Sequence, residues 1–195
     1  MSRISDRRLT WPVVGTREIH RDSWVVTLRE DTVQRPGHPD ESFPRLVLGH
    51  PGAVVVLPVD DQERVCCILQ YRHAGGGVFV ELPAGLCDAE GEDPQVTAAR
   101  ELQEEVELEA SDWRHLFTLY PSAGISAERH HIYLARGLTH SDRGNFELHA
   151  EEAELEVVWV PVDDLIEAVL DGRVTEGPLA SAVLAYDSLR HRGRL

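Results

Sequence analysis

Three carboxylates on one predicted helix are the residues of this chain best placed to do chemistry. Glu101 and Glu105 lie one helical turn apart and Glu104 lies beside them, because successive residues of an α-helix are rotated by about 100°. Like charges at this spacing destabilise an isolated helix by roughly 0.2–0.5 kcal/mol per pair. A hard divalent cation takes oxygen ligands and would offset that repulsion, and the neighbouring Arg100 can hold part of the cluster in place. The alternative is a solvated acidic helix face, which is common in a chain this acidic.

The residues around the cluster resemble the Nudix box, Gly-x5-Glu-x7-Arg-Glu-U-x-Glu-Glu-x-Gly-U, in which U is aliphatic. The positions that match in register are Arg100, Glu101, Leu102, Glu104, Glu105 and Leu108, and Glu92 stands the right distance before Arg100. Six residues instead of five separate Gly85 from Glu92, and Glu107 replaces the late glycine of the box. Because glycine favours the left-handed exit of a helix, we expect Glu107 to alter that exit.

The resemblance implies a ligand set for Mg²⁺, with Mn²⁺ as a possible substitute. In the family, carboxylates matching Glu101, Glu104 and Glu105 bind metal, and Glu105 is assigned a catalytic role as well. Arg100 would hold these carboxylates from outside the ligand set, as outer-shell partners do in metal sites.

The segment Glu81-Leu-Pro-Ala-Gly85 resembles a signature of the ADP-ribose pyrophosphatase-like subfamily. We expect Pro83 and Gly85 to make a tight turn that aims the Ala84 carbonyl inward, where the family uses it as a metal ligand. Glu81 is a candidate for contact with substrate or with metal-bound water. Its alternative is a carboxylate at a strand edge.

Two arginines are candidates for substrate binding. Arg72 ends the segment Gln70-Tyr-Arg72, and the family uses the matching arginine on substrate; the planar guanidinium suits phosphate or ribose. Arg45 aligns loosely with an Arg-Glu pair that some relatives use on the nucleotide across a dimer. Leu46 stands at the second position here and cannot accept a hydrogen bond from a base. Either arginine could instead be an ordinary surface residue.

The loop at residues 121–129 resembles the subfamily loop Pro-Gly-Phe-Ser-Asp-Glu, whose glutamate handles the attacking water. Glu128 falls on that glutamate, so the resemblance implies a catalytic role for it. Ala123, Ile125 and Ala127 replace the proline, phenylalanine and aspartate found in relatives. The alternative is a solvated loop carboxylate.

Together these features imply metal-dependent hydrolysis of the diphosphate linkage of a small nucleoside diphosphate-X compound. ADP-ribose, which would give AMP and ribose 5-phosphate, is the first choice, and a nucleotide sugar is the second. A ligand sensor that has lost catalysis is a further alternative, although such domains usually have eroded box carboxylates. A purely structural module has no support in the sequence.

The composition limits partners and location. The chain has 195 residues and a formal net charge of −15, which argues against nucleic acid and anionic membranes as partners. Its three cysteines form no disulfide framework, and its N-terminus has no apolar signal-peptide core. Cys66 and Cys67 lie in an apolar run and are expected to be small buried hydrophobes. We therefore expect a cytoplasmic protein.

The elements that must position these residues alternate between strands and helices. Strands are expected near residues 14–18, 24–28, 45–49, 53–58, 65–71, 78–82, 113–120, 131–135 and 155–160, and helices at 94–106, 162–170 and 177–190. A turn is expected near residues 20–23, a proline-rich break at 36–44 and an acidic, solvent-facing stretch at 151–156.

This order predicts an α/β protein, a Nudix-type α/β/α sandwich with a mixed sheet plus an N-terminal β-segment. Residues 1–49 would form that segment and residues 50–195 the Nudix hydrolase domain. In ADP-ribose pyrophosphatases a similar segment helps to form a homodimer, so the resemblance implies a homodimer here.

Overall fold

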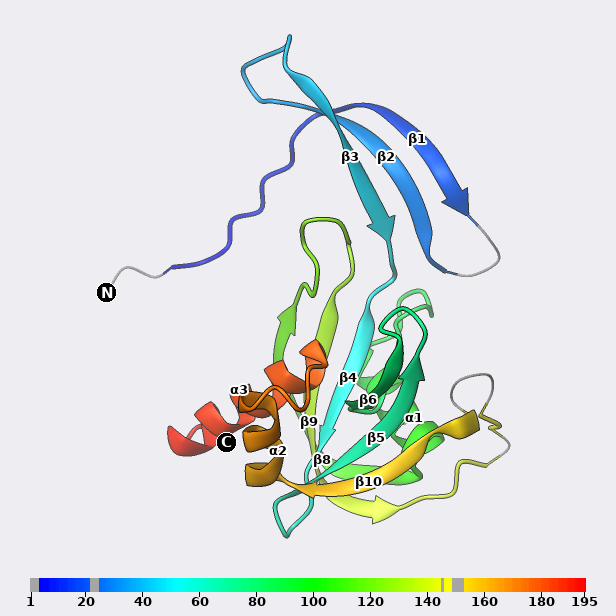
Figure 1. Cartoon of the computed structure of the whole chain (residues 1–195), viewed down its shortest axis with the longest axis vertical. Coiled ribbons are helices and arrows are strands. Elements are labelled where there is room, and N and C mark those ends of the chain that lie inside the picture. The colour runs from blue at the N-terminus through cyan, green and yellow to red at the C-terminus, as the bar shows by residue number, and fades with distance from the viewer. Residues whose placement is uncertain (1–3, 22–24, 145, 149–152) are drawn as a thin grey trace. The chain divides into compact units, whose positions relative to one another are not determined.

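A computed structural model of the chain describes residues 4–21, 25–144, 146–148 and 153–195. The chain divides into two units, residues 1–50 with 122–128 and residues 51–121 with 129–195 (Figure 1). The first unit therefore includes a loop that the sequence pattern placed in the hydrolase domain.

The first unit is a three-stranded antiparallel sheet in the order β1-β2-β3. Its strands are β1 (Val13–Arg21), β2 (Thr27–Gln34) and β3 (Ser42–Gly49). Strand β3 begins inside the predicted proline-rich break, because its Pro44 lies on an edge strand opposite Thr32, where a missing N–H is tolerated. Residues 22 and 23 of the turn predicted near residues 20–23, and Trp24 with them, lie outside the described residues, whereas residues 20 and 21 belong to β1.

The second unit contains two sheets and three helices. One sheet has the order β7-β4-β9-β8 and the other the order β10-β5-β6. Strands β4 and β9 are parallel and the remaining neighbours are antiparallel, so the predicted mixed arrangement is confirmed. The elements are β4 (Ala53–Pro58), β5 (Arg64–Arg72), β6 (Gly77–Glu81), β7 (Ala84–Leu86), α1 (Pro94–Val106), β8 (Leu108–Leu119), β9 (His130–His140), β10 (Glu156–Pro161), α2 (Val162–Leu170) and α3 (Gly177–His191).

Strand β4 is buried on both faces because helices cover both sides of the strands. Val55 and Leu57 belong to the core that includes α2 and α3, whereas Val54 and Val56 belong to the core under α1. Side chains alternate between the faces of a strand, so one apolar run serves two cores. Figure 1 shows α2 and α3 on one side of these strands and α1 on the other. The predicted α/β/α sandwich is therefore confirmed.

Three strands differ from their predicted form. Residues 83–85 were expected to form a tight turn, but Ala84–Leu86 is strand β7, which pairs antiparallel with β4. Strand β8 begins at Leu108, directly after α1, and β9 continues to His140. These two strands pair with each other along nearly their full length. Each strand is longer than its own residues suggest, because the other strand supplies its hydrogen-bond partners. Glu151 and Glu152 of the predicted acidic stretch lie outside the described residues.

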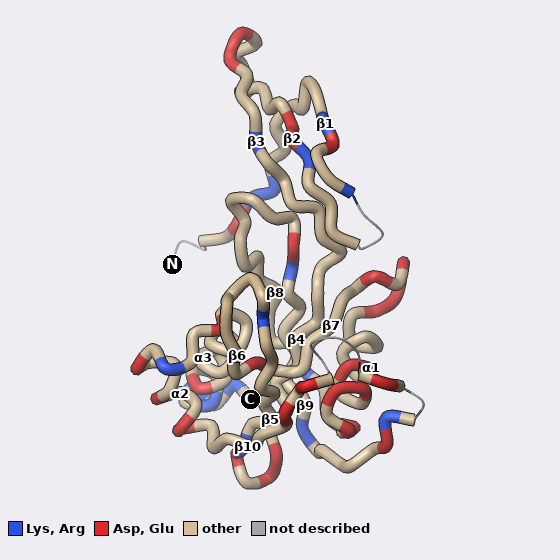
Figure 2. Tube along the Cα trace, turned by 45° about the vertical axis from the view of Figure 1, so that its right-hand side comes forward, with Lys and Arg blue, Asp and Glu red and all other residues tan. Residues whose placement is uncertain are grey.

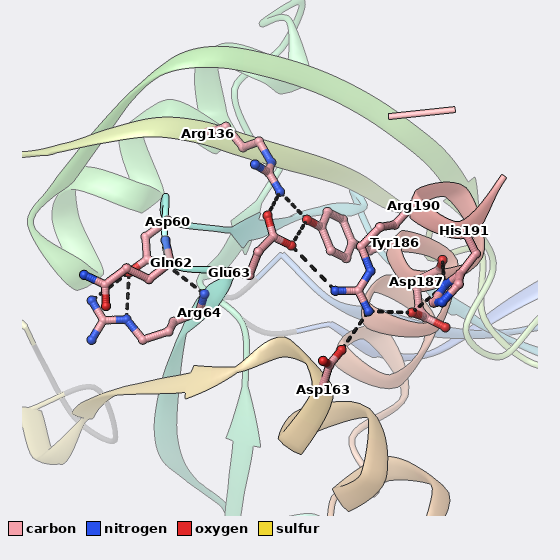
Figure 3. A network of polar contacts seen from close by, with 10 residues as sticks. All are labelled: Asp60, Gln62, Glu63, Arg64, Arg136, Asp163, Tyr186, Asp187, Arg190 and His191. Atoms are coloured by element: carbon pink, nitrogen blue, oxygen red, sulfur yellow. Dashed lines mark hydrogen bonds and ion pairs between the residues drawn. The ribbon is translucent and has the colours of Figure 1, made fainter. Parts of the chain in front are cut away.

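A polar network fixes the β4–β5 hairpin to both C-terminal helices (Figure 3). Glu63, in the hairpin turn, accepts a hydrogen bond of 2.6 Å from the hydroxyl of Tyr186 on α3 and contacts Arg136 of β9. Arg190 of α3 lies 3.8 Å from Glu63 and 2.7 Å from Asp163 of α2. Burial raises the pKa of Tyr186 to about 12, so its hydroxyl keeps the proton that it donates to Glu63.

Candidate active site

Helix α1 places the box carboxylates, and its start and burial follow from its own sequence. Asp93 is the N-cap, and its side chain accepts a hydrogen bond of 2.9 Å from the backbone N–H of Gln95. Ala98, Leu102 and Val106 recur every fourth residue and are buried in the core. Acidic residues recur along the same helix (Figure 2). The predicted bounds of this helix are confirmed.

Arg100 lies among three carboxylates of the box. One of its terminal nitrogens lies 3.1 Å from Glu101 and 3.6 Å from Glu104, and the other lies 3.6 Å from Glu92. Glu92 also accepts a hydrogen bond of 2.6 Å from the hydroxyl of Thr97. One guanidinium reaches three carboxylates from the loop and the helix, so these groups share one region of negative potential.

Glu105 is the buried member of the cluster, with 4% of its surface exposed. Its carboxylate accepts a hydrogen bond of 2.9 Å from the backbone N–H of Ala84 in β7. Bonds to the charged form of a carboxylate stabilise that form. The two segments that were expected to meet, the Glu-Leu-Pro-Ala-Gly signature and the helix, are thus joined by a direct contact.

Packing requires a glycine at position 85, which the sequence alone did not reveal. A Cβ atom there would lie 2.1 Å from Cδ of Glu101, which is far inside van der Waals contact. The residue lies in strand β7 and has no left-handed backbone. Gly85 is therefore needed for space beside a carboxylate rather than for a tight turn.

Arg72 and Glu81, which were predicted separately as substrate residues, form a pair. Nε of Arg72 lies 3.0 and 3.1 Å from the two oxygens of Glu81, and a terminal nitrogen lies 2.6 Å from one of them. This hydrogen bond raises the pKa of Arg72, and the charges of Glu81, Glu105 and Glu176 raise it further. The pair connects the end of β5 to the end of β6, next to the signature segment.

A cavity of about 290 Å³, wide open to solvent, lies beside this pair. It is lined by Arg72, Gly75, Phe79, Glu81 and Glu176. Glu176 is the N-cap of α3, and its side chain accepts a hydrogen bond of 2.7 Å from the N–H of Leu179. Burial raises the pKa of Glu176 to about 7, and the neighbouring Glu81 adds to the shift. The sequence did not single out Glu176, because nothing in its spacing links it to residues 72–81.

Glu128 and Arg45 belong to the first unit. The backbone N–H of Glu128 donates to the hydroxyl of Ser126 at 3.0 Å, and its carboxylate lies 3.7 Å from Nε2 of His50. The guanidinium of Arg45 stacks 4.2 Å from the centre of the Phe43 ring and donates to the Pro44 carbonyl. Both side chains therefore have local partners, and their catalytic and substrate roles stay predictions.

The cysteines are not nucleophiles in this fold. Cys66 and Cys67 are fully buried on β5, and burial raises the pKa of each to about 12. The expectation that they pack as small hydrophobes is confirmed. Burial also raises the pKa of Cys87, with the nearby Asp88 adding to the effect. The thiolate is the reactive form of cysteine, so the raised pKa values of Cys66 and Cys67 disfavour a nucleophilic role for them.

The donor set around α1 fits a hard divalent ion. Within the described ranges, no group of three or more His, Cys, Asp or Glu side chains has converged into a formed metal site. Glu92, Glu101 and Glu104 instead surround the guanidinium of Arg100, so a positive charge already lies at this place. Carboxylate oxygens are the ligands that Mg²⁺ and Mn²⁺ prefer.

An α/β/α sandwich whose loop and helix gather carboxylates around an arginine defines a domain of the Nudix class. A family model described as the NUDIX domain matches residues 49–180, and the chain belongs to this family. Across the described residues, no helix is long and apolar enough to cross a membrane.

Comparison with individual proteins agrees with this family. The chain is 41% identical to an ADP-ribose pyrophosphatase of Mycobacterium tuberculosis over 90% of its own length and 83% of that protein. It is 29% identical to a GDP-mannose pyrophosphatase of Escherichia coli over 89% of its length and 88% of that protein. A solved structure titled as an ADP compounds hydrolase superposes with a TM-score of 0.75 at 20% identity, covering 98% of this chain and all of that one, which shows the shared fold. The chain is a Nudix pyrophosphohydrolase.

Proposed function

We propose that this enzyme hydrolyses the diphosphate linkage of ADP-ribose and releases AMP and ribose 5-phosphate. The observation that carries the proposal is the carboxylate cluster of α1, in which Glu105 is held against the signature segment by the Ala84 N–H. The 41% identity to an ADP-ribose pyrophosphatase supports ADP-ribose as the substrate.

Metal is required in this proposal. Glu101, Glu104, Glu105 and the Ala84 carbonyl would hold Mg²⁺, with Mn²⁺ as a substitute. Bound there, the ion would neutralise charge on the phosphate oxygens and lower the pKa of a coordinated water. Arg100, which lies 3.1 Å from Glu101 and 3.6 Å from Glu104, would hold these two carboxylates from outside the ligand set.

The remaining roles belong to side chains that bind substrate or move protons. Glu128 takes a proton from the attacking water, because a carboxylate within hydrogen-bond reach of water can act as a general base. Arg72, aligned by Glu81, anchors the substrate, and Arg45 contacts a phosphate. A test of the base is Glu128→Gln, which should slow turnover while leaving metal affinity unchanged. An unchanged rate would assign the proton transfer to another group.

A nucleotide sugar is the second candidate substrate. Leu46 cannot accept a hydrogen bond from a base amino group, and it is 45% exposed in the first unit. The similarity to a GDP-mannose pyrophosphatase also favours this alternative. A ligand sensor is disfavoured, because every carboxylate of the box is present.

The deciding experiment is Mg²⁺-dependent release of nucleoside monophosphate from a substrate panel. The panel contains ADP-ribose, NADH, diadenosine polyphosphates, GDP-mannose and UDP-glucose. Fast cleavage of ADP-ribose supports the proposal, and faster cleavage of a nucleotide sugar replaces it with the alternative. Cleavage of no member, with Mg²⁺ and then Mn²⁺, would contradict both.

We also propose that the first unit forms a homodimer. All residues of β1 are exposed, and the only buried residues among those described in this unit are the polar Asp31 and Ser126. Exposed apolar side chains occur on it instead, at Trp11, Val13, Val14, Ile19, Val25 and Leu46. A three-stranded sheet needs an apolar face covered to be stable, and a second copy would cover it. Sedimentation that shows a monomer at micromolar concentration would contradict the dimer.

A cytoplasmic location is part of the proposal. Cys66, Cys67 and Cys87 are all free thiols, and free thiols are typical of reducing compartments. Cell fractionation should find the protein with cytoplasmic markers, and a membrane or secreted fraction would contradict this.

A further inference from the structure

We propose that the cavity beside Arg72 is the subsite for the sugar that the enzyme releases as its phosphate, and that Glu176 binds the hydroxyls of that sugar. This inference rests on the proposed hydrolysis of a nucleoside diphosphate-sugar compound. It adds to that function a binding site for the sugar. It also adds a specificity residue, Glu176, which lies outside the box and its signature.

The charges around the cavity favour a polyol over a further anion. Glu81 already takes two nitrogens of Arg72, at distances of 2.6 to 3.1 Å. Glu176 adds a second carboxyl group to the same lining. The positive charge of the single guanidinium is therefore already balanced by these carboxyl groups. A phosphate would meet no net positive charge in the cavity. Sugar hydroxyls can donate to the carboxyls and accept from the guanidinium.

The cavity also has an apolar wall. A Cβ atom at Gly75 would lie 2.5 Å from the edge of the Phe79 ring, so glycine allows the β5–β6 loop to approach the ring closely. Both residues line the cavity. Small-molecule sites combine apolar and aromatic walls with a few placed polar groups, and the C–H face of a sugar ring can pack on an aromatic ring.

Glu176 is held in place by the helix that it caps. One of its oxygens accepts from the N–H of Leu179 at 2.7 Å, which fixes the carboxyl while its other oxygen takes no part in that bond. Helix N-caps are preferentially Ser, Thr, Asp or Asn, so capping alone does not explain a glutamate here. The longer side chain reaches the cavity lining as well.

The surroundings of Glu176 suit it to hydroxyl recognition. Burial raises its pKa to about 7, and the charge of Glu81 raises it too, whereas Arg72 and the Leu179 N–H oppose the shift. Near neutral pH the group can therefore donate as well as accept hydrogen bonds. The cavity is also linked to the box, because its lining residue Glu81 lies three residues before Ala84, whose backbone N–H donates to Glu105 at 2.9 Å.

The test compares the two products as ligands of the full-length protein. Affinities of ribose 5-phosphate and AMP are measured by calorimetry with Mg²⁺, for the wild type and for Glu176→Ser. Serine keeps the N-cap and withdraws the carboxyl from the cavity. We expect ribose 5-phosphate to bind about tenfold more weakly or worse, since hydrogen bonds to charged groups have this strength. We expect AMP to bind within about twofold of the wild type.

Two further variants separate a local effect from a general one. Glu176→Gln keeps the length and the cap acceptor, and it should weaken ribose 5-phosphate by several-fold. Asp164→Ser removes an exposed carboxylate in the first turn of α2, outside the cavity, and should change neither affinity. Circular dichroism establishes that each variant is folded.

The outcomes distinguish this inference from the proposed function. Equal weakening of both products in Glu176→Ser, or no change in either, would overturn the sugar subsite. Absence of ribose 5-phosphate binding in the wild type would overturn it too, even if ADP-ribose is cleaved. Failure to cleave any compound of the panel would instead overturn the function.

Discussion

Replacing Glu107 with glycine should stabilise this protein. Glu107 is the C-cap of α1 and has a left-handed backbone, with φ 55° and ψ 42°, while its N–H bonds the carbonyl of Gln103 at 3.0 Å. The left-handed conformation costs a residue with a Cβ atom about 1–2 kcal/mol. Glycine escapes that cost but loses about 0.4–1 kcal/mol through the greater freedom of its unfolded chain.

The side chain of Glu107 contributes little in return. Its carboxylate lies 3.5 Å from Arg143 and its side chain is 41% exposed, and exposed ion pairs are worth about 0–1 kcal/mol. The net gain for Glu107→Gly is therefore about 0.5 kcal/mol. For a chain of this size, that raises Tm by about 1–2 °C.

Two control variants make the measurement decisive. Glu107→Ala loses the Arg143 contact and keeps the backbone cost, so it should be slightly less stable than the wild type. Glu63, the other described non-glycine residue with positive φ, also has φ 55°, but its carboxylate accepts the Tyr186 hydroxyl (Figure 3). Glu63→Gly should therefore lose about 1–3 kcal/mol, because it leaves the hydroxyl of the fully buried Tyr186 without its acceptor.

Urea unfolding gives the midpoint and slope for all four proteins. We expect equal slopes and a midpoint order of Glu107→Gly, wild type, Glu107→Ala and Glu63→Gly, from highest to lowest. If Glu107→Gly unfolds at a lower urea concentration than Glu107→Ala, the left-handed backbone at residue 107 does not destabilise the protein.

Three further results are expected. Gly85→Ala forces a Cβ atom to 2.1 Å from Cδ of Glu101, and steady-state assays should show turnover at least about tenfold lower, because small displacements of catalytic groups are costly. Glu105→Gln should lower kcat about a hundredfold or more with the fold retained, since metal-ion catalysis contributes several kcal/mol. The control Glu109→Gln, at an exposed position, should not lower kcat. Near-wild-type activity of Glu105→Gln would refute the metal assignment. The pKa of Glu176 is raised from 4.5 to about 7, so its contribution to stability is present below pH 4.5 and is lost as pH rises to about 7. Unfolding titrations should show Glu176→Gln gaining about 3 kcal/mol on the wild type across that range, and parallel curves would contradict the shift.

The box helix was predictable because its signals are local. Asp93 caps it, Pro94 occupies its first turn, and its apolar residues recur every fourth position. The same residues that define the motif also define the helix. The bounds Pro94–Val106 follow without knowledge of any partner. The expectation that Glu107 would alter the helix exit was wrong, because Glu107 adopts the left-handed conformation that a glycine favours, with φ 55° and ψ 42°.

Elements that depend on a partner strand were predicted less well. Residues 84–86 form a strand because β4 offers them an edge, although the sequence Pro83-Ala-Gly85 suggested a turn. Gly85 looked like a turn residue, yet the atom that requires a glycine there belongs to Glu101 on α1. Arg72 and Glu81 were each expected to contact substrate, but their side chains contact each other. The strand register could not have revealed this, because Arg72 pairs with Gly77 and Glu81 pairs with Ile68.

The two carboxyl groups of the cavity differ in how the sequence could have revealed them. Glu81 lies in a recognisable signature, whereas Glu176 comes from the start of the last helix, and no spacing rule relates it to residues 72–81. The signal available at Glu176 was a mismatch, because glutamate is not among the favoured N-cap residues. A serine or aspartate would cap α3 equally well and would leave the cavity with one carboxylate. We therefore attribute the choice of glutamate at position 176 to the cavity more than to the helix. The metal site of this chain follows a shared motif, whereas selectivity for the released sugar is expected to depend on Glu176, which lies outside that motif.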